Sequence, residues 1–156
     1  MPKQFCCRIA KSSNADEVFT VLTEVAEEIP LELETEKAQH TLLDLVREWC
    51  GNGVSMIASR GGQVIGFLLV KPDEYRRFQD SEQRQWLHIC YIGVKKEWRS
   101  KGMFQALMAE IMDRGLPLST EVKHANKSHM ARKLVGCFGF RMEGPSRRGD
   151  YFIWEP

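Results

Sequence analysis

The chain has no long hydrophobic run, and its net charge is close to zero. The longest apolar stretch, Val64–Val70, is far shorter than the roughly 20 residues that span a membrane. The N-terminus, MPKQFCCRIAKSSNADE, lacks the apolar segment of a secretory signal. A formal net charge of +1 provides no general attraction to nucleic acid or to an anionic membrane. We therefore expect a cytoplasmic protein that has neither a membrane nor a nucleic acid as its partner.

Cysteines in paired spacings are also missing. The five cysteines are an odd number, Cys6 and Cys7 are adjacent, and Cys50, Cys90 and Cys137 are scattered in apolar surroundings. This pattern fits neither a zinc site nor a disulfide framework. We expect buried free thiols and no bound metal.

Apolar periodicity is present, and it predicts a mixed α/β fold in one domain that covers residues 1–156. Arg60-Gly-Gly62 between two apolar runs is a hairpin signal, and Ser12 or Ser13 is expected to cap the first helix. The polar stretch 71–85 holds at most a short helix. We expect strands at 4–10, 54–59, 63–70, 86–94, 118–122, 140–143 and 151–154. We expect a first helix that ends at Pro30 and three more at 39–50, 100–114 and 126–138.

Charge is distributed unevenly along the chain. Residues 14–45 hold nine acidic side chains and one lysine, whereas residues 94–149 hold twelve Lys and Arg side chains and five acidic ones. One part of the chain therefore suits a cation and another suits an anion. Solvated helix faces would produce the same split.

The segment Val94–Met108, VKKEWRSKGMFQALM, carries the clearest functional pattern. An apolar strand passes through a basic, glycine-containing turn into a helix, so backbone N–H groups at the start of the helix lack partners. These groups and the helix dipole favour a phosphate, and Gly102 lets it approach the backbone. The Walker and dinucleotide-binding patterns are absent. The segment predicts a diphosphate site, with a solvated basic turn as the alternative.

Two motifs in this order resemble the GNAT superfamily of N-acyltransferases. Arg99-x-x-Gly102-x-Phe104 is similar to its acyl-CoA loop, and Asn126 followed by Ala131, Leu134 and Phe138-Gly-Phe140 is similar to its second conserved segment. The resemblance covers nearly the whole chain. It implies a central mixed, mostly antiparallel sheet of six or seven strands with about four helices.

The resemblance also implies the cosubstrate and the residues that bind it. Acetyl-CoA would donate an acetyl group to a primary amine by direct attack in a ternary complex, and no metal would take part. Phe104 stands where Gly or Ala is commonest, and Val135 stands where many members carry an acidic tyrosine. An alternative is therefore a weak or inactive acyl-CoA-binding regulatory or interaction module. The expected cofactor-binding residues are Ile92, Gly93, Val94, Arg99, Ser100, Lys101, Gly102, Met103, Phe104 and Asn126.

His88 is the candidate general base. It lies six residues before Val94, where some relatives carry a glutamate, and an imidazole suits proton transfer near neutral pH. A hydrogen-bonded structural histidine is the alternative. A nucleophilic Cys90 is disfavoured, because an apolar strand raises the pKa of a thiol. The other candidates are Asp73, Glu74 and Glu121 as bases, and Tyr91 and Tyr151 as acids.

The acceptor is expected to be a small-molecule or protein amine that carries positive charge. In the superfamily the first two helices and their connector shape the acceptor site, and here that region is acidic, with Glu32 and Glu34 as candidate substrate-binding residues. A homodimer is also possible, because the C-terminal strand ending at Trp154 would allow pairing across two copies.

Overall fold

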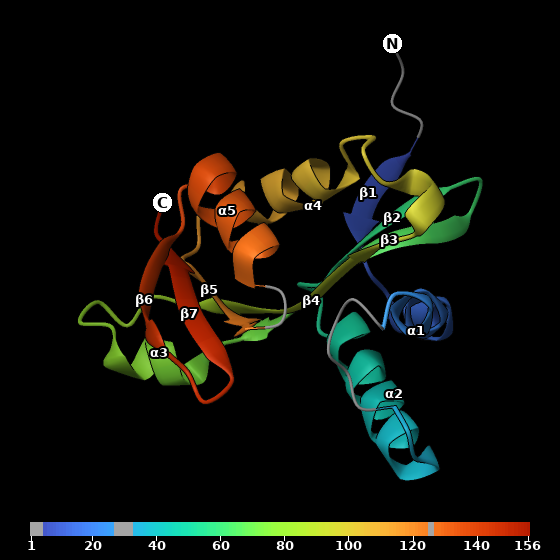
Figure 1. Cartoon of the computed structure of the whole chain (residues 1–156), viewed down its shortest axis with the longest axis horizontal. Coiled ribbons are helices and arrows are strands. Elements are labelled where there is room, and N and C mark those ends of the chain that lie inside the picture. The colour runs from blue at the N-terminus through green and yellow to red at the C-terminus, as the bar shows by residue number, and fades with distance from the viewer. Residues whose placement is uncertain (1–4, 27–32, 125–126) are drawn as a thin grey trace. The chain divides into compact units, whose positions relative to one another are not determined.

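The computed structural model describes residues 5–26, 33–124 and 127–156 (Figure 1). The chain forms two compact units, one made of residues 1–71 and 91–113 and the other of residues 72–90 and 114–156. Among the described residues, the strands follow the hydrogen-bonded order β1-β2-β3-β4-β5-β7-β6. The pairs β1–β2, β2–β3, β5–β7 and β6–β7 are antiparallel, and β4–β5 is parallel. The predicted mixed, mostly antiparallel sheet of six or seven strands is confirmed.

In its described residues, the first unit contains three α-helices, two 3₁₀ helices and the first three strands. α4 packs against β1 and β2, and α1 packs against α2. Its core is apolar, with Val18, Leu22, Ile57, Phe67 and Leu107 all inaccessible to solvent. The elements are β1 (Cys6–Ile9), η1 (Ser12–Asn14), α1 (Ala15–Glu24), α2 (Glu36–Cys50), β2 (Met56–Arg60), β3 (Gln63–Pro72), η2 (Lys96–Trp98) and α4 (Met103–Met112).

Among the described residues of the second unit are two α-helices and the last three strands. α5 packs against β5 and β6, where Leu134, Leu118 and Phe140 are buried. β4 contributes residues 87–90 to this unit and residues 91–94 to the first. The elements are α3 (Glu74–Gln79), β4 (Leu87–Val94), β5 (Leu118–Lys123), α5 (Lys127–Phe138), β6 (Arg141–Pro145) and β7 (Gly149–Trp154).

Capping interactions shift the starts of two helices from their predicted positions. α2 begins at Glu36 rather than Gln39 because Thr35 Oγ1 accepts a hydrogen bond from the Ala38 N–H at 3.0 Å. The expected serine cap of the first helix is wrong. Asn14 is the residue before α1, and its side chain accepts a hydrogen bond from the Lys11 N–H at 2.9 Å. Ser12 and Ser13 therefore lie in a short 3₁₀ helix, Ser12–Asn14, that precedes α1. Residues 27–30, where that helix was expected to end, lie outside the described residues.

The cysteines are free thiols, as predicted, but most are not fully buried. Cys6 and Cys137 are exposed, whereas Cys50 is buried and its burial raises the pKa of the thiol to about 11. The exposure of Cys6 and Cys137 contradicts the expectation of buried thiols. Neither has the apolar neighbours on both sides that a buried position needs, because Cys6 lies on β1 at the edge of the sheet and Cys137 lies near the end of α5.

The C-terminal strand does not offer a dimer interface of the expected kind. β7 lies between β5 and β6, with Trp154 paired to Leu118 on one side and Ile153 paired to Arg141 on the other. Both of its edges are used within the chain, so β7 cannot add a strand from a second copy. The expected pairing through Trp154 is wrong, and a homodimer stays a prediction.

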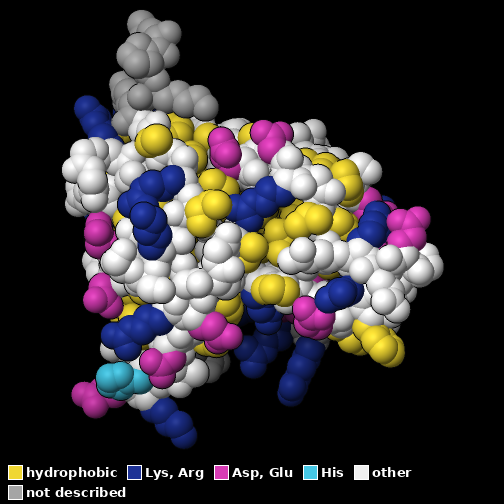
Figure 2. All heavy atoms as spheres, turned by 180° about the vertical axis from the view of Figure 1, so that it is seen from behind, with side chains coloured by type: hydrophobic (Ala, Val, Ile, Leu, Met, Phe, Trp, Pro, Cys, Tyr) yellow, Lys and Arg dark blue, Asp and Glu magenta, His cyan; other side chains and the backbone are white. Residues whose placement is uncertain are grey.

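The surface carries both charges. On the face in Figure 2, Lys and Arg side chains are interspersed with acidic and apolar ones rather than gathered in one field. Among the described residues, no helix has the length and apolarity required to cross a bilayer. The same residues contain no cluster of three or more His, Cys, Asp or Glu side chains suited to a metal ion.

Candidate active site

The first unit contains a backbone turn suited to an anion. The end of β4 is held to β3 by the Lys95 N–H, which donates to the Ile65 carbonyl at 2.9 Å. After η2 the backbone turns through two left-handed residues, Ser100 (φ 62°) and Gly102 (φ 81°), and α4 starts at Met103. A helix cannot run through left-handed residues, so α4 begins three residues later than the predicted Ser100.

Gly102 is the N-cap residue of α4, and no side chain caps the helix there. A Cβ atom added at Gly102 would have no heavy atom within 4 Å, so the glycine is needed for its backbone angles and not because neighbours crowd it. Ser100, Lys101 and Gly102 are all exposed, so an anion can approach this turn at the positive end of the helix dipole. This arrangement fits the diphosphate of an acyl-CoA.

Basic side chains surround this turn. Arg99 Nε donates to the Val94 carbonyl at 3.3 Å, which holds the guanidinium beside the end of β4. Lys101 Nζ lies 5.4 Å from the centre of the Trp98 ring, and Arg60 Cζ lies 5.0 Å from it. Arg60 comes from β2 and was not among the predicted residues. Only the fold brings it beside Trp98, so the sequence alone carried no signal for it.

Two glycines allow close packing around the end of β4, Gly66 against α4 and Gly93 against β3. A Cβ atom at Gly66 would lie 2.6 Å from Met103 Sδ, and one at Gly93 would lie 2.6 Å from Phe67 Cζ. Met103 is itself buried, so it anchors the start of α4 in the core. Gly66 thus lets Met103, the first residue of α4, pack beside the Gly93 carbonyl of β4, whose oxygen lies 3.3 Å from the Gly66 Cβ position.

We expect Gly93→Ala to destabilise the protein by roughly 2 kcal/mol, because the new methyl group would overlap the fully buried Phe67 ring. Urea denaturation monitored by circular dichroism would measure the change. Gly136→Ala is a matched control, since Gly136 lies in α5 with no heavy atom near its Cβ position. A helical alanine there should stabilise by about 0.5–1 kcal/mol. Equal stability of Gly93→Ala and wild type would contradict the packing described.

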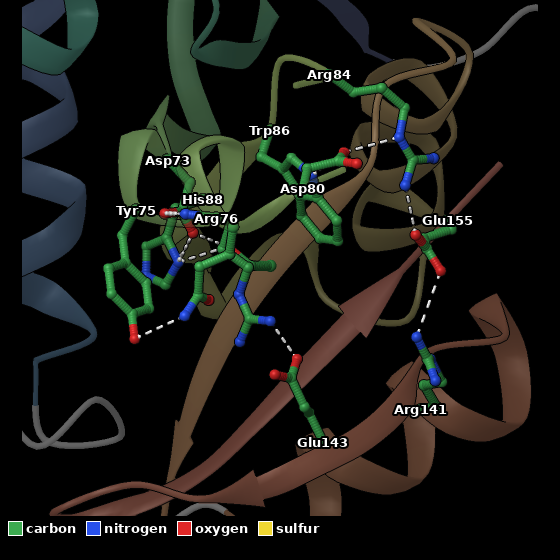
Figure 3. Close-up of polar contacts among 12 residues, drawn as sticks. Asp73, Tyr75, Arg76, Asp80, Arg84, Trp86, His88, Arg141, Glu143 and Glu155 are labelled. Atoms are coloured by element: carbon green, nitrogen blue, oxygen red, sulfur yellow. Dashed lines mark hydrogen bonds and ion pairs between the residues drawn. The ribbon is translucent and has the colours of Figure 1, made fainter. Parts of the chain in front are cut away.

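The second unit holds a polar cluster around His88 (Figure 3). His88 Nδ1 lies 2.9 Å from Ser119 Oγ, and Ser119 Oγ donates to Asp73 Oδ2 at 2.5 Å. His88 and Ser119 are register partners on the parallel strands β4 and β5. Asp73 is the N-cap of α3, where its Oδ1 accepts from the Arg76 N–H at 3.1 Å. Three separate elements therefore bring an imidazole, a hydroxyl and a carboxylate into one chain of hydrogen bonds.

Tyr151 and Glu121 extend this cluster along β5 and β7. The two are register partners, and Glu121 lies two residues after Ser119, on the same face of the sheet. Burial raises the pKa of the Tyr151 phenol, and the charge of Glu121, which accepts its hydrogen bond, raises it further. The Arg76 guanidinium lies 5.9 Å from the Tyr151 ring centre and forms an ion pair with Glu143 (Figure 3).

A second set of contacts anchors the segment after α3. Asp80 Oδ2 accepts from the Trp86 indole N–H at 2.9 Å and from Arg84 Nε at 2.8 Å (Figure 3). The hydrogen bond from Trp86, with those from the Glu82 backbone and Arg84, lowers the pKa of Asp80 to about 2. Arg84 also donates to Glu155 at 2.7 Å. The segment between α3 and β4 is thereby tied to the C-terminus, which supports the position of Asp73.

Comparison with known proteins assigns the chain. The model of the acetyltransferase (GNAT) family matches residues 21–140. The chain belongs to the acetyltransferase (GNAT) family. The expected family and the expected acetyltransferase enzyme are confirmed.

Solved structures share this GNAT fold at low sequence identity. PaiA N-acetyltransferase from Thermoplasma acidophilum, crystallised with coenzyme A, has a TM-score of 0.70 and 14% identity over 97% of this chain and 99% of its own. Polyamine N-acetyltransferase from Drosophila melanogaster has a TM-score of 0.69 and 14% identity, over 97% of this chain and 100% of its own. Diaminobutyrate acetyltransferase EctA from Paenibacillus lautus has a TM-score of 0.68 and 16% identity, over 99% of this chain and 96% of its own. No relative among curated proteins matches the chain significantly by sequence.

In this GNAT chain the expected cofactor-binding residues from Ile92 to Phe104 all belong to the first unit. They form one continuous segment, which runs from the last residues of β4 to the first turn of α4. Asn126 lies outside the described residues. Val135, at the usual tyrosine position, is half exposed on α5.

The expected acid and base candidates are divided between the units. His88, Asp73, Glu121 and Tyr151 belong to the second unit. Tyr91 belongs to the first, where its ring packs 5.8 Å from that of Trp49 at an angle of 53°.

A groove of about 420 Å³ in the first unit lies beside α2. Its lining is mostly apolar with one lysine. Glu34 is exposed and does not line this groove, and Glu32 lies outside the described residues. The lining residues are Leu33, Thr35, Lys37, Ala38, Thr41, Leu42, Leu45 and Tyr91.

Proposed function

We propose that this GNAT protein transfers an acetyl group from acetyl-CoA to a primary amine by direct attack in a ternary complex, with the whole chain acting as one acyltransferase domain. The observation that carries the proposal is the left-handed Gly102 at the uncapped start of α4. It places the positive end of the helix dipole at an exposed turn next to basic side chains. That is the environment a diphosphate requires.

Under this proposal the chain binds its cosubstrate mainly through the backbone. N–H groups of the turn at residues 100–102 hold the diphosphate, since the Arg99 N–H already donates to the Lys96 carbonyl, and the side chains of Arg99 and Lys101 meet the remaining negative charge. The backbone of Ile92–Val94 accepts the pantetheine arm as an added strand. Acetyl-CoA, when bound, supplies the acetyl group as a reactive thioester.

The amine must be uncharged at nitrogen before it can attack. His88 accepts the proton that the amine loses, and either Tyr91 or Tyr151 donates a proton to the departing thiol. A phenol is already protonated near neutral pH, and the raised pKa of Tyr151 makes it a weaker acid, so the shift does not favour Tyr151 over Tyr91. One C–N bond forms and one C–S bond breaks, while one proton passes from the amine to His88 and one passes from the tyrosine to the departing sulfur.

For the acceptor we propose an amine that carries a further charged group. Drosophila polyamine N-acetyltransferase forms N-acetylagmatine, and EctA is crystallised with its substrate diaminobutyric acid. Agmatine, the amine from which N-acetylagmatine forms, and diaminobutyric acid are both small amines with a further charged group. Glu34 is exposed at the start of the second-helix region and is the described acidic candidate for such a ligand.

An acceptor screen tests this function. Purified protein is mixed with acetyl-CoA and, in turn, agmatine, spermidine, diaminobutyrate, a lysine peptide and neutral butylamine, and free thiol is measured. We expect thiol release above the hydrolysis background with at least one charged amine and less with butylamine. Coenzyme A binding detected by calorimetry, with no thiol release from any amine, would instead favour the binding-module alternative.

A further inference from the structure

We propose that Asp73 and Ser119 are positioning residues that fix the tautomer of His88, so that its Nδ1 carries the proton and its Nε2 carries the lone pair that accepts the proton of the amine. The inference rests on the proposed role of His88 as base. It adds two residues to that role and specifies which nitrogen reacts.

The proton positions follow from the donors and acceptors in the chain of hydrogen bonds. An ionised carboxylate can only accept, so the single hydroxyl proton of Ser119 lies on the bond to Asp73 Oδ2. The 2.5 Å length of that bond is typical of a hydroxyl bound to a carboxylate. Ser119 Oγ can then only accept from the imidazole, so His88 Nδ1 must carry a proton.

The surroundings keep these three groups in place. Ser119 is only 1% exposed, and the side chains of Asp73 and His88 are 14% and 22% exposed. Asp73 is held at its other oxygen by the start of α3, and its N–H donates to the Trp86 carbonyl at 2.8 Å. The carboxylate oxygen lies 3.8 Å from His88 Nδ1, which is close enough to stabilise the imidazolium that proton transfer creates.

This arrangement differs from that of a merely structural histidine. A structural role would need one hydrogen bond of either polarity, whereas the relay directs the ring nitrogen that lacks a proton away from Ser119. In the free side chain both tautomers are populated. The protein therefore selects one tautomer through the Asp73 carboxylate, which acts by way of Ser119 because it lies 3.8 Å from His88 Nδ1, beyond hydrogen-bond distance.

The test is long-range ¹H–¹⁵N NMR of the full chain without ligands, with the His88 signal assigned by its loss in His88→Gln. In wild type above the titration of the ring, we expect Nδ1 protonated and Nε2 unprotonated. Ser119→Ala should shift the ring to a mixture or to the opposite tautomer, and Ser119→Thr should restore the wild-type pattern. Asp73→Asn preserves a good N-cap but can donate to Ser119, so it should also move the ring toward the opposite tautomer.

The kinetic readout accompanies the spectra. Ser119→Ala should lower kcat about tenfold with KM for acetyl-CoA unchanged, and Ser119→Thr should recover most of the loss. Thr120→Val is the matched control. Thr120 is also buried on β5 but its hydroxyl donates to the Ile89 carbonyl at 3.1 Å, so we expect its spectrum and kcat to stay within twofold of wild type.

An unprotonated Nδ1 in wild type, an unchanged ring signal in Ser119→Ala, or a shifted tautomer with unchanged kcat would each overturn the proposal. Failure of the proposed function is a separate result, because it is seen as the absence of turnover in the wild-type acceptor screen. The NMR measurement needs no turnover and therefore tests the tautomer independently of the proposed function.

Discussion

Gly102→Glu is expected to lower the affinity for coenzyme A by about 100-fold or more. Two unit charges roughly 6 Å apart at an effective dielectric constant near 20 repel by about 3 kcal/mol, which corresponds to a factor of about 100 in binding. A left-handed residue with a side chain adds about 1–2 kcal/mol of backbone strain, which falls partly on stability and partly on the geometry of the turn. Isothermal titration calorimetry with coenzyme A measures the change.

Two further variants separate charge from strain. Gly102→Gln has the size of glutamate without its charge, so it should bind coenzyme A more tightly than Gly102→Glu and more weakly than wild type. Gly115→Glu is the matched control, because Gly115 also has a left-handed backbone (φ 71°) and open space around its Cβ position. It should lose stability to a similar extent and keep its affinity. If Gly102→Glu bound coenzyme A as wild type does, the diphosphate assignment would be abandoned.

Much of the fold was predictable because apolar spacing reflects burial directly. Val18, Leu22 and Val25, expected on one stripe, are all buried. The hairpin around Arg60-Gly-Gly62 forms as predicted, because Gly61 and Gly62 both have positive φ angles. The short α3 has exposed aromatic side chains, with Phe78 88% exposed, so it leaves no apolar stripe in the sequence.

The diphosphate turn was predictable for a different reason. Its residues are contiguous, so local chemistry describes the whole of it: a strand, basic residues, a glycine and a helix. What the sequence could not supply was the left-handed angle of Ser100, which delays the helix to Met103. Side-chain identity alone gives little warning of such an angle in a serine.

The relay was not predictable, although each of its three residues is visible in the sequence. Ser119 lies 31 positions from His88 and 46 from Asp73, so their contact depends on the parallel register of β4 and β5. Shifting that register by one residue would turn Ser119 to the opposite face of the sheet. Alternation along β4 predicts which residues share a face with His88, but it does not predict what the next strand places opposite.

The contacts of the rival bases favour His88 in that role. Asp73 already accepts from Ser119 and from the start of α3, and Glu121 accepts from Tyr151. Glu74 is exposed on α3 and lies 3.7 Å from Arg77. Oxygen atoms of Asp73 and Glu121 are thus already engaged by neighbouring donors, and Glu74 lies beside a guanidinium, whereas the His88 ring is oriented by Ser119.

His88→Gln is accordingly expected to lower kcat at neutral pH by roughly 100-fold or more, the usual contribution of a general base. A glutamine amide can still donate to Ser119 Oγ, so the hydrogen bond to β5 survives while the proton acceptor is lost. The affinity for coenzyme A should stay within twofold of wild type, because the diphosphate turn belongs to a different segment. Steady-state kinetics with the best amine of the acceptor screen, together with calorimetry, measures both quantities.

The pH dependence provides the sharper test of this role. Without a base, the variant relies on amine that is already deprotonated in solution, and this fraction rises tenfold per pH unit below the pKa of the amine. The rate of His88→Gln should therefore climb steadily with pH and approach that of wild type in alkaline buffer. A variant within threefold of wild type at pH 7, or one that stays equally impaired at every pH, would mean that His88 is not the group that takes the proton.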